Sequence, residues 1–345
     1  MERTISIALA GDTMLGRGVG DAIREEPARP LVSEAVSEAA AEADVFVLNL
    51  ECCISDRGTP WPDPSKPFFF RGPSSAIRVL QDLGVSCVTL ANNHALDFGE
   101  EALIDTFQHL DEAGIKHAGA GRDVTEARTP VVLEVNGSRL AVQGLTDHPA
   151  GYAAGRGRPG VAFADLRRGT PRWLRRCIGT VDADIVLLTP HWGPNMATEP
   201  RPSVRAAARA LVDAGATLVA GHSAHVFHGV EGRVLYDLGD FLDDYAVDPV
   251  LRNDLGLLFL VTVGPSGPVR LEAVPLKLDY CFTRLAADED AAWIAHRFRE
   301  ACRPFGTEVR QERGRLVVSC PAAPASGRGP DAFTRRSTRP AVDPG

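Results

Sequence analysis

Several carboxylate, amide and imidazole side chains of this 345-residue chain directly follow short apolar segments. These side chains are Asp12, Asn49 and Glu51, Asn92 to His94, His191, and His222 with His225. The preceding segments, such as residues 44–50 and 184–189, are typical of short buried strands. Because parallel strands of one sheet bring their carboxyl ends to one edge, we expect these side chains to converge there.

The residue types in this set are those of a metal centre. Histidine, aspartate and glutamate without any thiolate suit Zn, Mn or Fe. Two such ions about 3.5–4 Å apart can activate a water and clamp a phosphoryl or carbonyl oxygen. A polar turn with a satisfied histidine is the alternative for residues 92–94 taken alone. Recurrence after five strands favours the metal centre, with one or two divalent ions as cofactors.

The hydrophobic pattern predicts strands alternating with helices, and therefore an α/β fold. Asn136-Gly137 lies between two strand-like segments and predicts a hairpin turn. The predicted strands cover residues 5–10, 44–50, 85–90, 116–118, 131–135, 139–145, 184–189, 217–220, 226–230, 233–236, 257–263, 269–278 and 315–319. The predicted helices cover residues 30–43, 74–83, 98–113, 169–178, 201–214 and 288–302.

The composition is that of an ordinary globular protein, with 44% hydrophobic and 24% charged residues. A net charge of −8 argues against nucleic acid and anionic membrane surfaces as partners. The N-terminus has no signal-peptide pattern, and no segment approaches the roughly 20 apolar residues of a membrane span. The seven cysteines lack CxxC spacing, so we expect reduced thiols and a cytoplasmic protein without a membrane anchor.

The length leaves room for one large α/β domain or two smaller ones. We expect a single domain over residues 1–320, with the motifs in residues 5–245 and closing strands and a helix in 255–320. Residues 321–345 are rich in Pro, Gly, Ser and Arg and are expected to be disordered. The loop at residues 55–73 is long enough to suggest a functional role. Its three consecutive phenylalanines, residues 68–70, are predicted to be a core-facing or edge strand.

The order Gly-Asp, Asn-x-Glu, Asn-Asn-His, His-Trp-Gly, Gly-His-x-x-His resembles the CapA-like, poly-γ-glutamate capsule biosynthesis proteins. That family belongs to the calcineurin-like metallophosphoesterase superfamily. The matching stretches are GDTMLGR (11–17), NLE (49–51), LANNHALDFG (90–99), HWG (191–193), GHSAHV (221–226) and YDLGDF (236–241). The resemblance implies an α/β sandwich of two mixed β-sheets flanked by helices, with a metal centre at the strand ends.

The resemblance also assigns roles to single residues. His94 matches the general acid, and Glu51 matches the ligand that two metals share. Arg17 and Arg71 are candidates for holding an anionic small-molecule or polymer substrate, and Asn49 and Asp240 are further substrate-binding candidates. The metal-ligand positions match Asp12, Glu51, Asn93, His191, His222 and His225.

Four features depart from the pattern of the superfamily or family. Met14 stands where the superfamily has histidine, so one ligand of the first metal is missing. Residues 223–224 are Ser-Ala instead of His-Pro, Asp240 replaces an asparagine, and Cys52-Cys53 follow Glu51 where glycine is common. These departures predict one tight metal with a weak second site, or an additional ligand from Asp240 or Asp243.

Three functions follow from these observations. The first is a metal-dependent hydrolase, in which a metal-activated water attacks a phosphoester or a γ-glutamyl-type amide. The second is an accessory protein of poly-γ-glutamate or capsule polymer synthesis with little catalysis. The third is a degenerate fold that keeps a structural metal.

Overall fold

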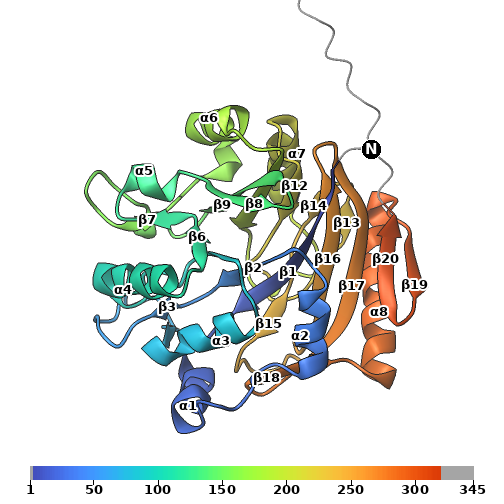
Figure 1. Cartoon of the computed structure of the whole chain (residues 1–345), viewed down its shortest axis with the longest axis horizontal. Helices are drawn as coiled ribbons and strands as arrows, with labels where there is room; N and C mark the ends of the chain where they lie inside the picture. The colour runs from blue at the N-terminus through green and yellow to red at the C-terminus, as the bar shows by residue number, and fades with distance from the viewer. Residues whose placement is uncertain (1–2, 320–345) are drawn as a thin grey trace, which may run out of the picture.

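The computed structural model describes residues 3–319, so the tail predicted at residues 321–345 lies outside the described residues. Two mixed β-sheets form the middle layers of this part of the chain (Figure 1). Helices α1 to α4 cover the outer face of the larger sheet, and α6 and α7 cover the outer face of the smaller one. The predicted architecture of two mixed sheets flanked by helices is confirmed.

The larger sheet has ten strands, in the order β19-β20-β17-β16-β1-β2-β5-β6, with β15 paired to β1 and β18 to β17. Strands β1, β2, β5 and β6 are parallel to one another, and β16 joins β1 in antiparallel orientation. The strands are β1 (Ile5–Thr13), β2 (Val45–Leu50), β5 (Cys87–Thr89), β6 (Lys116–Ala118), β15 (Asp240–Leu242), β16 (Leu255–Gly264), β17 (Gly267–Asp279), β18 (Phe282–Leu285), β19 (Val309–Glu312) and β20 (Arg315–Ser319).

The smaller sheet has six strands, in the order β13-β14-β12-β11-β9-β8. Its central strands are parallel, and the predicted hairpin forms its edge as the antiparallel pair β8 and β9. Two strand pairs, β3 with β4 and β7 with β10, lie outside both sheets. These strands are β3 (Cys53–Ile54), β4 (Arg71–Gly72), β7 (Ala120–Gly121), β8 (Val131–Val135), β9 (Ser138–Thr146), β10 (Gly160–Val161), β11 (Ile185–His191), β12 (Leu218–Ala220), β13 (Val230–Glu231) and β14 (Val234–Leu235).

Most helices lie where the hydrophobic pattern predicts them, although their ends differ by a few residues. Helices α1 and α5 were not predicted, and the helix predicted at residues 30–43 begins only at Glu34. The helices are α1 (Arg17–Glu25), α2 (Glu34–Ala41), α3 (Ile77–Asp82), α4 (Gly99–Glu112), α5 (Val124–Ala127), α6 (Arg172–Thr180), α7 (Pro202–Asp213) and α8 (Asp288–Cys302). The prediction of a strand at residues 68–70 is wrong, because these residues form irregular loop.

The side chains of β1 point alternately to the two faces of the larger sheet, and this shows how the two sheets are held together. Ile5, Ile7 and Leu9 point into the core between the two sheets, whereas Ala8 and Ala10 point into the core beneath the helices. Successive strand residues face opposite sides of a sheet, so one strand serves both cores. Burial of apolar surface in these cores fixes the sheets face to face, and with them the positions of their strand ends.

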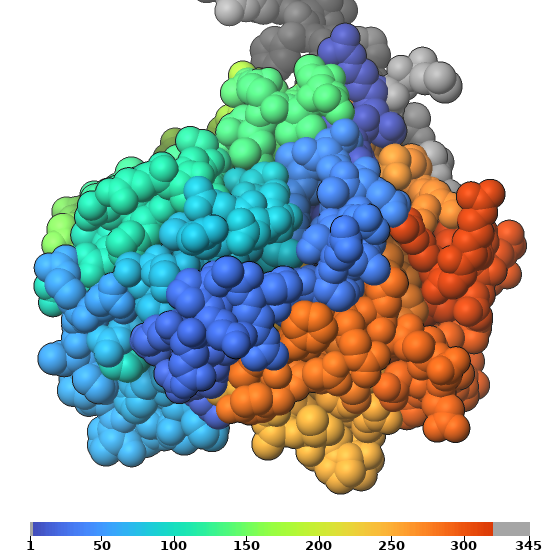
Figure 2. All heavy atoms as spheres, turned by 60° about the horizontal axis from the view of Figure 1, so that its bottom comes forward, coloured from blue at the N-terminus to red at the C-terminus, as the bar shows by residue number. Residues whose placement is uncertain are grey.

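Segments far apart in the sequence meet around α2. The space-filling view shows the N-terminal segments in blue beside the orange segment near residue 280 (Figure 2). Val32 forms a parallel bridge with Thr283, and the Ser33 amide donates a hydrogen bond to the Thr283 carbonyl oxygen at 2.8 Å. This pairing holds residues 32 and 33 extended and delays the start of α2.

None of the helices in residues 3–319 is long and apolar enough to cross a membrane.

The six cysteines of this part of the chain are free thiols, as predicted, and Cys320 lies outside it. Cys52 is fully buried, and this burial raises the pKa of its thiol to about 12. The side chain therefore stays protonated at neutral pH and packs in the core beneath the helices.

Candidate metal centre

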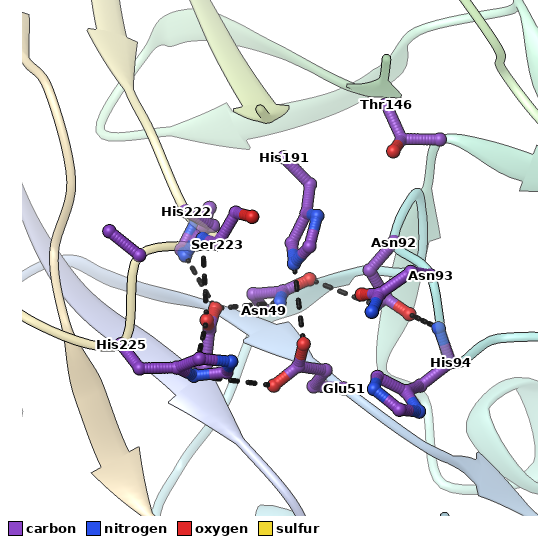
Figure 3. A network of polar contacts seen from close by, with 12 residues as sticks. Asn49, Glu51, Asn92, Asn93, His94, Thr146, His191, His222, Ser223 and His225 are labelled. Carbon is purple, nitrogen blue, oxygen red and sulfur yellow. Dashed lines mark hydrogen bonds and ion pairs between the residues drawn. The ribbon is translucent and has the colours of Figure 1, made fainter. Parts of the chain in front are cut away.

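The predicted site residues come together where the two sheets meet at their strand ends (Figure 3). The expectation that one sheet supplies all of them is wrong. The larger sheet supplies Asp12, Asn49, Glu51 and the turn at residues 92–94, whereas the smaller sheet supplies His191, His222 and His225. Figure 3 shows His191 pointing toward Glu51, with His222 and His225 on one side and Asn92 to His94 on the other.

Asp12 lies within β1, at a point where the strand is irregular. Ala10 pairs with Leu48 of β2 and Asp12 with the next residue, Asn49, so Gly11 bulges between them. A β-carbon on Gly11 would lie 1.8 Å from the carbonyl oxygen of Gly239, so only glycine fits. The bulge turns the Asp12 carboxylate into the space between the sheets, as bulges beside functional sites commonly do.

Two groups of three possible metal ligands share Asp12. In each group one ligand atom from every residue lies within 4.8 Å of the others. The first group is Asp12, Glu51 and His191, and the second is Asp12, His225 and Asp240. The resemblance gives the shared position to Glu51, but in this structure Asp12 is the residue common to both groups.

In the first group, the His191 Nε2 lies 3.3 Å from the Glu51 Oε1, and both residues are buried. Tyr245 donates a hydrogen bond from its hydroxyl to the Glu51 Oε2 at 3.3 Å. The Nδ1 of His191 is buried and has no hydrogen-bond partner among the described residues. These contacts orient Glu51 and His191 toward each other.

In the second group, the His225 Nδ1 lies 2.8 Å from the Asp240 Oδ1 and 3.5 Å from the Asp12 Oδ2. Strand β15 pairs with β1 so that Asp240 is directly opposite Asp12. The second oxygen of Asp240 is buried and has no described partner. A buried oxygen without a partner is costly, and a cation beside it would remove that cost.

The loop after β12 holds the other imidazole of the site. His222 Nδ1 lies 3.1 Å from the Asp12 Oδ1, and His222 forms a bridge with His191 that links the loop to β11. Ser223 has a φ of 110° and His225 a φ of 59°, both in the region that favours glycine. Such strain costs on the order of 1–3 kcal/mol per residue and is typical of functional sites.

The carboxylates of the centre have strongly perturbed pKa values. Burial alone would raise the pKa of Asp12, but the hydrogen bond and charge of His222 outweigh burial and hold it below its usual range. Burial and the neighbouring charge of Asp12 raise the pKa of Glu51 well above its ordinary value. Burial also raises the pKa of Asp240, to about 6. A site that crowds negative charge in this way favours a bound cation.

The pKa values of the imidazoles differ because the rings face different groups. Burial lowers the pKa of His191 well below its ordinary value. Burial also acts on His225, but the charges of Asp240, Glu51 and Asp12 outweigh it and raise its pKa. His191 is therefore available as a neutral nitrogen ligand, and His225 needs a cation to replace its proton.

The donor set fits a divalent metal ion. Oxygen and nitrogen donors dominate, and no thiolate lies in either group. The Oδ1 of Asn93 is also buried without a described partner, as are the Asp240 Oδ2 and the His191 Nδ1. Unsatisfied buried polar atoms are uncommon in folded proteins, and the Asp240 Oδ2, which belongs to the second group, is where a bound cation would supply the missing partner.

Met14 does not face the centre. It is fully buried in the core beneath the helices, and its sulfur accepts a hydrogen bond from the Gly16 amide at 3.0 Å. The histidine ligand that the superfamily has at this position therefore has no counterpart here. Asp240 is the additional carboxylate that lies beside Asp12 and His225, whereas Asp243 belongs to neither group.

His94 lies beside the two groups and is held by Asp97, a residue that the sequence reasoning did not assign. The His94 Nδ1 lies 2.6 Å from the Asp97 Oδ2, and Phe70 stacks on the imidazole with 3.9 Å between ring centroids. Asp97 is fully buried and also accepts hydrogen bonds from the Tyr152 hydroxyl and the Phe70 amide. Its spacing of three residues from His94 in the LANNHALDFG stretch was the available signal. Burial lowers the pKa of His94 to about 4.

The predicted substrate-binding residues separate into three groups. Arg17 lines a cavity together with His94 and His225. Arg71 does not line that cavity, because its guanidinium donates to the carbonyl oxygen of Arg57 and stacks 4.1 Å above Phe98. The polar atoms of Asn49 and the carboxylate of Asp240 face other protein groups of the centre. Asn49 donates to the Asp12 Oδ1 at 2.8 Å and accepts from Asn92 and Thr89.

The family model and the sequence relatives agree with the motif resemblance. The sequence model of the bacterial capsule synthesis protein family PGA_cap matches residues 6–245. A relative in Mycobacterium tuberculosis described as "Probable polyglutamine synthesis accessory protein" is 30% identical, over 92% of this chain and 97% of its own. The "PGA biosynthesis protein CapA" of Bacillus subtilis is 30% identical, over 79% of this chain and 72% of its own. A crystal structure of a hypothetical protein from Thermus thermophilus covers 81% of this chain and 96% of its own, with 18% identity and a TM-score of 0.44.

Proposed function

This chain belongs to the bacterial capsule synthesis protein family PGA_cap, and we propose that its carboxylate–imidazole centre is the active site of a metal-dependent hydrolase. The family and its named relatives associate the chain with capsule and polyglutamate synthesis. The proposed substrate is an anionic small molecule or polymer, and the bond cleaved is a phosphoester or a γ-glutamyl-type amide. On this proposal the chain is a member of the calcineurin-like metallophosphoesterase superfamily.

The observation that carries this proposal is the pair of ligand groups that share Asp12. Asp12, Glu51 and His191 would hold one divalent ion, with support from Asn93 and His222. The second ion would be held by Asp12, His225 and Asp240. When bound, Mn, Fe or Zn ions of this kind lower the pKa of a water and polarise a phosphoryl or carbonyl oxygen.

His94 is the proposed proton donor to the leaving group. Asp97 occupies its Nδ1, so the ring orientation is fixed and the Nε2 is left for the substrate. Burial lowers the pKa of His94 to about 4, so the ring is neutral in the resting protein. An anionic substrate beside the ring favours its protonated form, because an opposite charge stabilises the imidazolium. Asp97 acts in this account as a positioning residue.

The test combines metal analysis with turnover. We expect one or two Mn, Fe or Zn ions per chain after reconstitution, and hydrolysis of bis(p-nitrophenyl) phosphate or of γ-glutamyl-p-nitroanilide. His94→Gln should lower turnover by roughly 10²–10⁴-fold while metal content stays unchanged. Absence of bound metal after reconstitution, or full turnover in His94→Gln, would contradict the proposal.

A second candidate function rests on the printed name of the mycobacterial relative, which describes an accessory protein. On this alternative the chain binds the polymer or its synthase and turns over little substrate. Co-purification with a membrane synthase, with polymer synthesis unchanged in His94→Gln, would favour it over the hydrolase. The structural-metal alternative predicts instead a large loss of melting temperature on chelation and no hydrolysis.

A further inference from the structure

A cavity of about 340 Å³ opens beside the proposed active site. His94 and His225 form its inner wall, so a molecule in the cavity would contact both the proposed proton donor and the proposed metal site. The other walls are mostly apolar. They are formed by Arg17, Phe68, Phe70, Asn195, Met196, Tyr245, Ala246 and Asn253.

Arg17 is the residue with a permanent positive charge among those that line this cavity. Its Nε lies 3.3 Å from the Oδ2 of Asp244, a buried carboxylate that also accepts a hydrogen bond from the Gly18 amide. The Arg17 side chain is 39% exposed. Asp244 thus fixes the guanidinium from behind and leaves its outer edge open to a ligand.

Three aromatic rings surround this guanidinium. Its central carbon lies 5.6 Å from the ring centroids of Phe68 and Phe70, and 6.0 Å from that of Tyr245. Phe68 is 56% exposed and lines the cavity, so its ring is accessible to a ligand there. Phe70 connects the two ends of the cavity, because it also stacks on His94.

The charge of Arg17 decides what the cavity accepts. Aromatic cages of this kind bind cations when they are vacant. Here the cage already contains a guanidinium, so a cationic ligand would be repelled and an anionic one attracted. A carboxylate or a phosphate matches the paired donors of arginine. The rings suit a planar or apolar segment between that anion and the bond that is cleaved.

We infer that the substrate's leaving group occupies this cavity and carries an anionic group of its own, which Arg17 binds. The placement rests on the proposed function, because it is the role of His94 as proton donor that puts the leaving group here. Phe68, Phe70 and Tyr245 then contact the segment between the cleaved bond and this second anion. Substrates whose leaving group carries a carboxylate or a phosphate are therefore preferred over neutral ones.

Calorimetric binding to the reconstituted protein tests this inference with three probes. Benzylphosphonate carries one anion, (4-carboxybenzyl)phosphonate adds a carboxylate, and p-xylylenediphosphonate adds a second phosphonate. We expect the second anion to lower Kd by about tenfold to a hundredfold. The probe with the larger gain identifies whether the natural group is a carboxylate or a phosphate. Equal Kd values for all three probes would overturn the inference.

Variants of Arg17 test whether this residue causes the lower Kd of the probes with a second anion. Arg17→Met should abolish the advantage of the second anion and leave the Kd of benzylphosphonate within about twofold. Arg17→Lys keeps the charge and should retain part of the advantage, so it serves if Arg17→Met does not fold. Phe68→Ala should weaken all three probes, because it removes an apolar wall. Equal weakening of all three probes by Arg17→Met and by Arg17→Lys would contradict the assignment.

A fourth probe separates this inference from the proposed function. 4-Methylbenzoate needs no metal, and its uncharged counterpart is 4-methylbenzamide. If the protein holds no metal and hydrolyses nothing, preferential binding of 4-methylbenzoate that Arg17→Met abolishes would still support the anion site. Equal binding of these two compounds, or none, in a protein with wild-type melting temperature would overturn it.

Discussion

The two sheets contribute different chemistry to the same centre. The larger sheet supplies acids and amides, with Asp12 and Glu51 at the ends of neighbouring parallel strands. The smaller sheet supplies imidazoles, with His191 at the end of β11 and His222 after β12. Burying the acids alone or the imidazoles alone would be costly, because groups of the same charge would lie close together without an opposite charge. The centre therefore exists only when the two sheets pack face to face.

A second comparison, within the smaller sheet's own loops, shows what the carboxylates do. His225 and His228 are three residues apart and both are buried. His225 faces three carboxylates, which raise its pKa in spite of burial. His228 instead lies 2.7 Å from the carbonyl oxygen of Ala197, and burial lowers its pKa to about 4. The carboxylates of the opposite sheet, more than burial, therefore set the pKa of His225 apart from that of His228.

The largest expected effect comes from the residue that both ligand groups share. Asp12→Asn should weaken metal binding at both groups, by more than about 100-fold, because the amide removes a charged ligand. His191→Gln should affect only the group that contains Glu51. Elemental analysis after dialysis against trace metal should therefore show a larger loss for Asp12→Asn than for His191→Gln.

Asp165→Asn is the matched control for this pair, because that carboxylate pairs with Arg167 and Arg168 outside the centre. Its metal content should equal that of the wild-type protein. Wild-type metal content in Asp12→Asn would show that the shared carboxylate is not a ligand. Melting temperatures of all variants, measured without metal, would separate ligand loss from misfolding.

A smaller effect is expected from the additional carboxylate. Asp240→Asn should lower occupancy of the group that contains His225, with a change in affinity of about tenfold to a hundredfold. Asp243→Asn is the control, since Asp243 is also buried with an unpartnered oxygen but lies in neither group. Calorimetric titration with metal would measure the metal affinity of both variants. Equal affinities in the two variants would remove Asp240 from the ligand set.

The smallest effect concerns stability and tests the contrast between His225 and His228. The pKa of His228 falls from 6.5 to about 4 in the folded protein, so the unfolded chain binds its proton more readily. Stability from this residue is therefore complete above pH 6.5 and is lost as the pH falls toward 4. Between pH 7 and pH 5 the metal-free wild type should lose about 2 kcal/mol more unfolding free energy than His228→Gln. Urea unfolding at both pH values measures this difference, and parallel losses would contradict the assignment.

The hydrophobic pattern was sufficient for elements whose own residues decide their structure. The strands at residues 116–118 and 315–319 and the helix at 288–302 lie where they were predicted. Helix α1 was missed because its sequence, RGVGDAIRE, contains two glycines and has low helix propensity. It forms because Val19 and Ile23 pack into the core beneath the helices. There, tertiary packing overrides local preference.

The sequence alone determined which residue types follow each strand, because strand and turn patterns are local. That information brought Asp12, Glu51, His94, His191 and His225 into one hypothesis. Only the tertiary structure decided that the acids come from one sheet and His191, His222 and His225 from the opposing one. It also decided that Asp240 lies beside Asp12, since that contact depends on how β15 pairs with β1. Strand pairing between distant segments depends on burial of whole sheet faces, and no local pattern contains it.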